Sequence, residues 1–337
     1  MSDVARAAGV SSMTVSNVVN GRPGVGDATR ARVAEAVARL GYRANTSARH
    51  LRTGRTGAVG LLVPEVDASY YTHLASRLSR GLEAHGYHLV LERTGATREG
   101  ESRALAPERL DAYDGVVVSP VVLDADDLRR AVDGRPCVVL GERPLRGPYP
   151  RVAMDDVGGA ALAVHHLVEH GARRVALVGG RAARAGADMP SLRTTGYRRA
   201  LLDAGLAVDE RLVVPVRAFD RRGGHEAVVH LHEQGVELDA AFVLTDAAAV
   251  GVLRALADLG RDVPGEVQVV GFDNDDESAY TVPRLTTVDP GNAAMAEAVV
   301  ELLLAQVDGG TSAGPRLRPA EARLVVREST RAAPQRG

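Results

Sequence analysis

Residues 3–20 read DVARAAGVSSMTVSNVVN, and this stretch decides the fold of the amino-terminal part of the chain. Its apolar positions recur at helical spacing in two short segments, and Gly9 between them supplies the backbone freedom of a tight turn. Ser11 can cap the second helix. The positions expected to face inward are Val4, Ala5, Ala8, Val15, Val18 and Val19. Those expected to face outward on the second helix are Ser12, Met13, Thr14, Ser16 and Asn17.

Two helices joined in this way predict a helix-turn-helix, which places the start of its second helix in the major groove of DNA. An ordinary helix pair with a solvated face is the alternative that this stretch alone leaves open. Further along, Asp27 can cap a third helix over Thr29–Leu40, which Gly41 would end.

The ordered motifs of this region resemble the LacI/GalR (lactose-repressor) family of bacterial transcription regulators. The family motifs begin at Asp3, Ala8, Thr14, Val19, Thr29, Leu40 and Ala48. One departure is that few residues precede Asp3, so Ser2 is expected to cap the first helix alone.

The resemblance implies a homodimer that binds double-stranded operator DNA of pseudo-palindromic sequence, most simply as a repressor of catabolic or transport genes. The DNA-binding residues that it implies are Ser12, Met13, Thr14, Ser16, Asn17, Asn20, Arg22, Ala48, Leu51 and Arg52. Leu51 matches the leucine that the family inserts into the minor groove.

Charge is segregated along the chain in the way this assignment requires. Up to Thr56 there are nine arginines and three acidic residues, whereas the remainder is net acidic and the whole chain carries a net charge of −2. A basic head on an acidic body is typical of a DNA-binding module. The sequence contains no lysine, which excludes Walker-type ATPases and enzymes with a Schiff-base lysine.

Beyond residue 57, short apolar runs alternate with amphipathic helical stretches, which predicts parallel sheets with crossover helices and an α/β class. We expect a two-lobed body like that of periplasmic binding proteins, with a doubly wound parallel sheet in each lobe. The expected divisions are a helix-turn-helix head at 1–44, a hinge helix and linker at 45–57, an effector-binding and dimerisation body at 58–330 and a tail at 331–337. The first lobe would cover about 58–155 and 289–315, and the second about 156–288 and 316–330.

Ligands of such sheets bind at the carboxyl ends of the strands, which here would be the cleft between the two expected lobes. The effector-binding residues that the resemblance implies are Asp67, Tyr70, Tyr71, Ser119, Asp155, Arg193, Phe219, Thr245 and Asp273. Flat aromatic faces beside Arg and Asp suit a small polyhydroxylated effector such as a sugar or nucleoside. The family usually has Asn-Asp where this chain has Thr245-Asp246, which leaves the choice of ligand open.

No catalytic, metal or cofactor site is expected. His166 and His170 fit the spelling of an inverted zinc motif, but a structural helix is the preferred interpretation, and Cys137 lies in an apolar run as a buried hydrophobe. The rival classes are a solute-binding protein of the periplasmic type and an α/β hydrolase, which would need a nucleophile elbow. Because no apolar segment of membrane-spanning length is present, a soluble cytoplasmic protein without membrane contact is expected.

Overall fold

The computed structural model describes residues 1–19, 23–41, 55–66, 69–141, 143, 145, 147, 149–181, 186, 188–310 and 317–332. The chain divides into two compact units, Met1–Thr56 and Gly57–Gly337. Each unit has its own hydrophobic core, so each is described by itself.

The head contains the three expected helices, α1 (Ser2–Ala8), α2 (Ser12–Val19) and α3 (Asp27–Arg39). Gly9 adopts the left-handed conformation (φ 63°), which confirms the expected turn. The core that unites the helices consists of Val4, Ala5, Ala8, Val15, Val33 and Ala36. Val18 and Val19 pack against this core but are only partly buried.

Two expected caps are wrong. Asp27 is the first residue of α3, because Gly26 takes the extended N-cap conformation before it. Asp27 therefore lies in the first turn, where its negative charge interacts favourably with the positive end of the helix dipole. Similarly, Ser2 is the first residue of α1, and the N-cap is Met1, with no side chain capping the helix.

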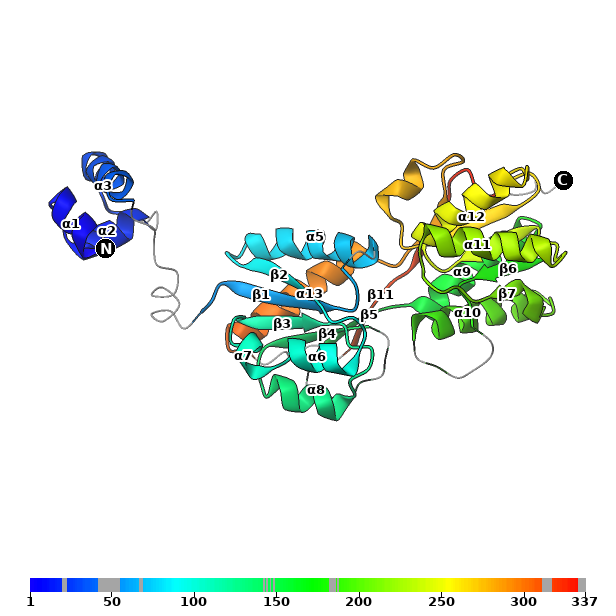
Figure 1. Ribbon diagram of the computed structural model, residues 1–337, viewed down its shortest axis with the longest axis horizontal. Helices are drawn as coiled ribbons and strands as arrows, with labels where there is room; N and C mark the ends of the chain where they lie inside the picture. The colour runs from blue at the N-terminus through cyan, green and yellow to red at the C-terminus, as the bar shows by residue number, and fades with distance from the viewer. Residues whose placement is uncertain are drawn as a thin grey trace. The chain divides into compact units, whose positions relative to one another are not determined.

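The first lobe of the body is a parallel sheet of order β11-β5-β4-β3-β1-β2 with helices on both faces (Figure 1). Its strands are β1 (Ala58–Val63), β2 (His88–Arg93), β3 (Gly115–Val118), β4 (Cys137–Leu140), β5 (Arg151–Met154) and β11 (Leu317–Ala320). Its helices are α5 (Ser69–Glu83), α6 (Arg98–Ala104), α7 (Pro107–Leu110), α8 (Ala125–Val132) and α13 (Asn292–Val307). Leu61 packs under α5 and α13, whereas its neighbour Leu62 packs under α6 to α8. Because both faces are covered, the sequences of β1, β3 and β4 are continuous apolar runs.

The second lobe repeats this design in the order β12-β10-β9-β8-β6-β7, with β12 alone antiparallel to its neighbour. Its strands are β6 (Val175–Val178), β7 (Val213–Val214), β8 (Ala240–Val243), β9 (Gln268–Phe272), β10 (Thr286–Asp289) and β12 (Arg323–Val325). Its α-helices are α9 (Asp156–Glu169), α10 (Met189–Asp203), α11 (Arg221–Glu233) and α12 (Asp246–Asp258). Short 3-10 helices, η1 (Glu210–Leu212) and η2 (Asp276–Ala279), lie in its loops.

The chain passes between the lobes three times, after β5, after β10 and after β11. Because β11 pairs with β5, Leu317–Ala320 belongs to the first lobe, beyond the boundary at 315 expected from the sequence. The parallel sheets, the flanking helices and the separate helical head confirm the expected α/β class.

Two glycines bring α11 and α12 together in the second lobe. A Cβ atom on Gly224 would lie 1.9 Å from the Ala248 carbonyl oxygen, and one on Gly251 would lie 1.8 Å from the Arg221 carbonyl oxygen. The close crossing also joins the residues that precede each helix, because the Thr245 hydroxyl donates to the Phe219 carbonyl oxygen (3.2 Å). The two glycines therefore fix the position of one end of the second lobe.

We predict that Gly224→Ala lowers the free energy of unfolding of the body by about 1–3 kcal/mol, because the added methyl group meets backbone that cannot rotate away. Urea denaturation measures this change. The matched control is Gly81→Ala on α5, whose Cβ would meet side-chain atoms of Val300, the nearest being the Cγ2 methyl group at 3.0 Å, and no backbone atom among its three nearest neighbours. Equal destabilisation by the two variants would contradict the tight crossing.

Candidate functional site

The second helix of the head presents a small set of side chains for contact with a partner. The Ser11 hydroxyl accepts a hydrogen bond from the Thr14 N–H (3.1 Å), which confirms the expected cap of α2. Met13 is 74% exposed, while Thr14 and Asn17 are partly exposed and Ser12 is exposed.

Ser16, expected to face outward, is buried at 7% exposure. Ser16 lies about 100° round the helix from Val15. Because α2 contacts both α1 and α3, the buried part of its surface is wide enough to include both residues. The outward surface of α2 therefore consists of Ser12, Met13, Thr14 and Asn17. The other residues expected to bind DNA lie outside the described residues: Asn20, Arg22, Ala48, Leu51 and Arg52.

In the body, a cavity of about 420 Å³ lies where the carboxyl ends of the two sheets meet. Seven of the nine residues expected to bind an effector line it: Tyr70, Tyr71, Ser119, Arg193, Phe219, Thr245 and Asp273. The structure thus brings together residues separated by up to about two hundred positions in sequence. We call this cavity the interlobe cleft. Asp155 does not line the cleft, because its Oδ1 accepts from the Gly158 N–H (2.8 Å) and caps α9. Asp67 lies outside the described residues.

Aromatic side chains supply the apolar faces of the cleft. Tyr70 and Tyr71 begin α5 and meet edge to face, with ring centroids 4.9 Å apart. The Tyr71 hydroxyl pairs with Ser119 Oγ at 2.9 Å, and this contact joins α5 to the end of β3. Phe219 lines the cleft from the second lobe. Aromatic faces of this kind bind the C–H faces of sugar rings or stack on flat rings.

Arg193 reaches the cleft from α10 but is only 2% exposed. Its Nε donates to Asp156 Oδ1 (2.6 Å), its Nη1 donates to the Leu244 carbonyl oxygen and its guanidinium lies 3.4 Å from the centre of the Phe272 ring. These contacts occupy two of its five N–H donors and tie it to three separate elements, so Arg193 organises the cleft wall as well as lining it. A substitution here would leave the buried Asp156 without its cation.

Buried acids lie beside this arginine. Asp273 is 3% exposed, adopts a positive φ of 113° and has its Oδ1 3.8 Å from Arg193 Nη2. Burial raises the pKa of Asp273 well above its usual range, although Arg193 opposes the shift. Burial likewise raises the pKa of Asp246 to about 8, against hydrogen bonds from the Thr287 hydroxyl (2.6 Å) and the Asp275 N–H (2.9 Å).

The hydroxyl of Thr245 is occupied by the protein itself. It accepts from the Ala248 N–H (3.2 Å) as the cap of α12, and it donates to Phe219. A hydroxyl carries one donor, so little hydrogen-bonding capacity is left for a ligand. Thr245 therefore contributes to the shape of the cleft and little to hydrogen bonding with an effector.

One contact outside the aromatic wall also joins the lobes. His73 Nδ1 on α5 lies 2.8 Å from Asp275 Oδ1 in the second lobe. Since the N–H of Asp275 also donates to Asp246, successive hydrogen bonds link His73 of the first lobe to the buried acids of the second.

Sequence reasoning missed several lining residues: Arg143, Leu145, Met154, Arg181, Asp188 and Met189. Arg143 follows β4 and Arg181 follows β6, so the rule that ligands gather after parallel strands could have found both. Met154 ends β5, so the same rule could have found it, whereas Met189 begins α10 and carries no such signal.

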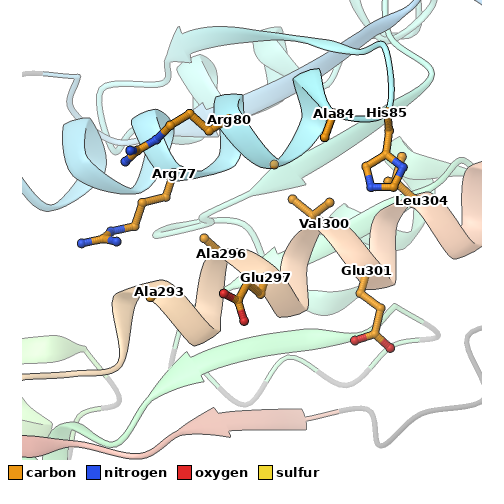
Figure 2. Close-up of a pocket in the computed structure, with 11 residues that line it drawn as sticks. Arg77, Arg80, Ala84, His85, Ala293, Ala296, Glu297, Val300, Glu301 and Leu304 are labelled. Atoms are coloured by element: carbon orange, nitrogen blue, oxygen red, sulfur yellow. The ribbon is translucent and has the colours of Figure 1, made fainter.

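A second hollow, of about 720 Å³, lies between α5 and α13 (Figure 2). Arg77 and Arg80 stand on one wall, and Glu297 and Glu301 on the other. This groove contains no residue from the carboxyl end of a strand, and none of the residues expected to bind an effector lines it. The interlobe cleft is therefore the candidate effector site.

The histidine pair expected to be structural is held by protein groups. His166 Nε2 pairs with Thr330 Oγ1 (2.9 Å), and burial lowers the pKa of His166 to about 4. Within the described part of the chain, no three metal-ligating side chains come together, and no helix is long and apolar enough to cross a membrane. Cys137 is buried, as expected, and burial raises the pKa of its thiol to about 12.

We predict that the raised pKa of Asp246 makes the body less stable as pH rises from about 4 to about 8, and that Asp246→Asn removes this contribution to the pH dependence of stability. A raised pKa means that the folded protein keeps a proton that the unfolded chain releases, so each such group contributes a slope of up to about 1.4 kcal/mol per pH unit. Asparagine can still accept from the Asp275 N–H. Urea denaturation at several pH values checks this, with Asp126→Asn on exposed α8 as the control. A slope unchanged by Asp246→Asn would contradict the buried proton.

Comparison with known proteins identifies the two units separately. The family model described as bacterial regulatory proteins, lacI family, matches residues 1–45, and the model described as a periplasmic binding protein-like domain matches residues 164–330. The HTH-type transcriptional regulator CelR of Thermobifida fusca is 35% identical over 339 residues, which cover 97% of this chain and 96% of that protein.

Solved structures agree with these matches. A LacI-family regulator from Sanguibacter keddieii is 42% identical over 82% of this chain and 99% of that one, with a TM-score of 0.75. A complex of the transcriptional regulator CelR with cellobiose is 31% identical over 97% of this chain and 98% of that one, with a TM-score of 0.71.

These similarities decide between the classes that the sequence left open. The relatives are transcriptional regulators and not enzymes, and their similarity extends over the helix-turn-helix head, which does not favour the solute-binding alternative. The chain therefore belongs to the LacI family of bacterial transcriptional regulators.

Proposed function

We propose that this protein is a cytoplasmic homodimeric repressor of catabolic or transport genes. It binds a pseudo-palindromic operator with an affinity that depends on a small polyhydroxylated effector in the interlobe cleft. The observation that carries the proposal is the cleft itself, where two tyrosines and a phenylalanine meet hydrogen-bonding groups at the strand ends of a chain that also has a DNA-binding head. A sugar is favoured, because the related CelR has been solved with cellobiose.

Self-association is supported by two apolar side chains of the second lobe. Tyr280 and Val282 are 85% and 95% exposed, on the segment that follows η2. Large apolar side chains so fully exposed two positions apart favour an interface with another chain. A second copy would present two recognition helices to DNA, so the operator would be a pseudo-palindrome with half-sites roughly 10 base pairs apart.

For the head, we predict that Met13→Ala and Asn17→Ala change which base pairs are preferred in each operator half-site. Both side chains lie on the outward surface of α2, where they can reach base edges in the major groove. Selection from a library of symmetric sites, followed by gel-shift titration, measures the preference. The control is Arg39→Gln on α3, which should weaken all sites alike or none. If Met13→Ala and Asn17→Ala also weaken all sequences uniformly, these residues do not read bases.

For the cleft, we predict that Phe219→Leu weakens binding of the effector by about 2- to 12-fold while operator affinity without effector is unchanged. The aliphatic side chain keeps most of the volume but loses the aromatic face, worth about 0.5–1.5 kcal/mol. Calorimetry with cellobiose and other neutral sugars, together with release of operator DNA, measures both effects. Leu202→Ala, exposed on α10 and away from the cleft, is the control. Sugar binding that is unchanged in Phe219→Leu would place the effector elsewhere.

A further inference from the structure

Arg143 is a cleft residue whose role the family assignment does not supply. It follows β4 by three residues, is half-buried and lines the interlobe cleft. Gly141 before it has a φ of 112°, which turns the chain as it leaves the strand. The side chain therefore starts from a strand end, the place where parallel sheets gather ligand-binding groups.

The guanidinium of Arg143 is fixed by the loop that follows β3. Its Nη1 donates to the carbonyl oxygens of Val121 (2.6 Å) and Leu123 (3.0 Å). The opposite side of the same loop is held by Glu101, which is 1% exposed and accepts from the N–H groups of Val121 (2.7 Å) and Leu123 (2.8 Å). The loop is thus clamped between a carboxylate and a guanidinium, and Arg143 is held in one orientation before any ligand arrives.

The other charges that line the described part of the cleft have partners of opposite sign. Arg181 pairs with Asp188 (2.9 Å). Glu65 receives two hydrogen bonds from Arg93, from Nε (2.5 Å) and from Nη2 (2.8 Å).

Arg193 faces Asp156 and Asp273, so its charge is also balanced. Among the described residues, Arg143 makes hydrogen bonds to carbonyl oxygens and no ion pair. No described residue accepts a hydrogen bond from its Nε or Nη2, so these donors can serve another acceptor.

From this arrangement we infer that the effector carries an anionic group, a carboxylate or a phosphate, which Arg143 binds through Nε and Nη2. The inference rests on the proposed function, since it names the chemistry of the ligand in the same cleft. Carboxylate and phosphate oxygens match the planar fork of a guanidinium and form charge-assisted hydrogen bonds. A neutral sugar in the same place would remove water from the arginine without supplying a counter-charge.

The test compares neutral and acidic sugars on the full chain. Calorimetry is performed with D-glucose and D-galactose, with their uronates and with their 6-phosphates. In at least one series the acidic member should bind about tenfold more tightly than its neutral parent, the size of one charged hydrogen bond. The carboxylate and phosphate arms show which acid the cleft prefers.

The variants separate recognition from structure. Arg143→Gln should abolish the acidic-to-neutral affinity ratio, and Arg143→Lys should retain part of it, because charge remains while the fork is lost. A purely structural clamp would weaken neutral and acidic sugars alike and leave the ratio unchanged. Arg80→Gln, the same charge change in the α5–α13 groove, is the matched control and should behave as wild type.

Binding of inorganic phosphate alone tests the anion site without a contribution from the sugar ring. Inorganic phosphate should bind saturably to wild type and to Arg80→Gln, and not to Arg143→Gln. Phosphate binding that is absent, or equal in all three proteins, would overturn the inference. Neutral sugars that bind as tightly as acidic ones would also overturn it and leave the proposed function standing, whereas failure of every sugar to bind would overturn the proposed function instead.

Discussion

The buried charge of Arg193 is the interaction on which the cleft depends. From α10 it reaches Asp156 at the start of α9, the carbonyl oxygen of Leu244 after β8 and the Phe272 ring at the end of β9. A cation inside a protein is tolerated only when charged and polar acceptors surround it. Meeting that condition brings the ends of separate strands and helices to fixed positions around one guanidinium. The geometry of the candidate effector site is therefore a consequence of surrounding a buried cation with acceptors.

The same requirement explains the acids around it. Asp273 and Asp246 are almost fully buried, and this burial raises the pKa of each. Asp275, bonded to Asp246, is also the group that His73 of the first lobe contacts. A ligand that changed the distance between the lobes would therefore act on a polar network that is already costly to rearrange. This gives the cleft a physical means of favouring one arrangement of the lobes over another.

Much of this could be predicted from the sequence because its signals are local or periodic. The apolar runs at 58–63 and 137–140 became strands, and Gly9 and Ser11 set the turn and cap of the head. The errors have different causes. Ser16 lies at the edge of a helix face, where periodicity cannot tell buried from exposed, and the carboxylate of Asp155 caps its own helix. The place of Arg143 after a strand could have been recognised, but the orientation of its side chain depends on contacts with a loop about twenty residues earlier, which no local pattern records.

Ligand binding in the cleft and DNA binding by the head are expected to be energetically coupled. The most direct test measures the affinity for operator DNA with and without a cleft ligand. It also measures the affinity for that ligand with and without operator DNA. Thermodynamic linkage requires that the two ratios be equal. We predict that both ratios differ from one by the same factor, in the range of about 5- to 150-fold typical of allosteric proteins. Ligand and operator that bind with affinities independent of each other would contradict it.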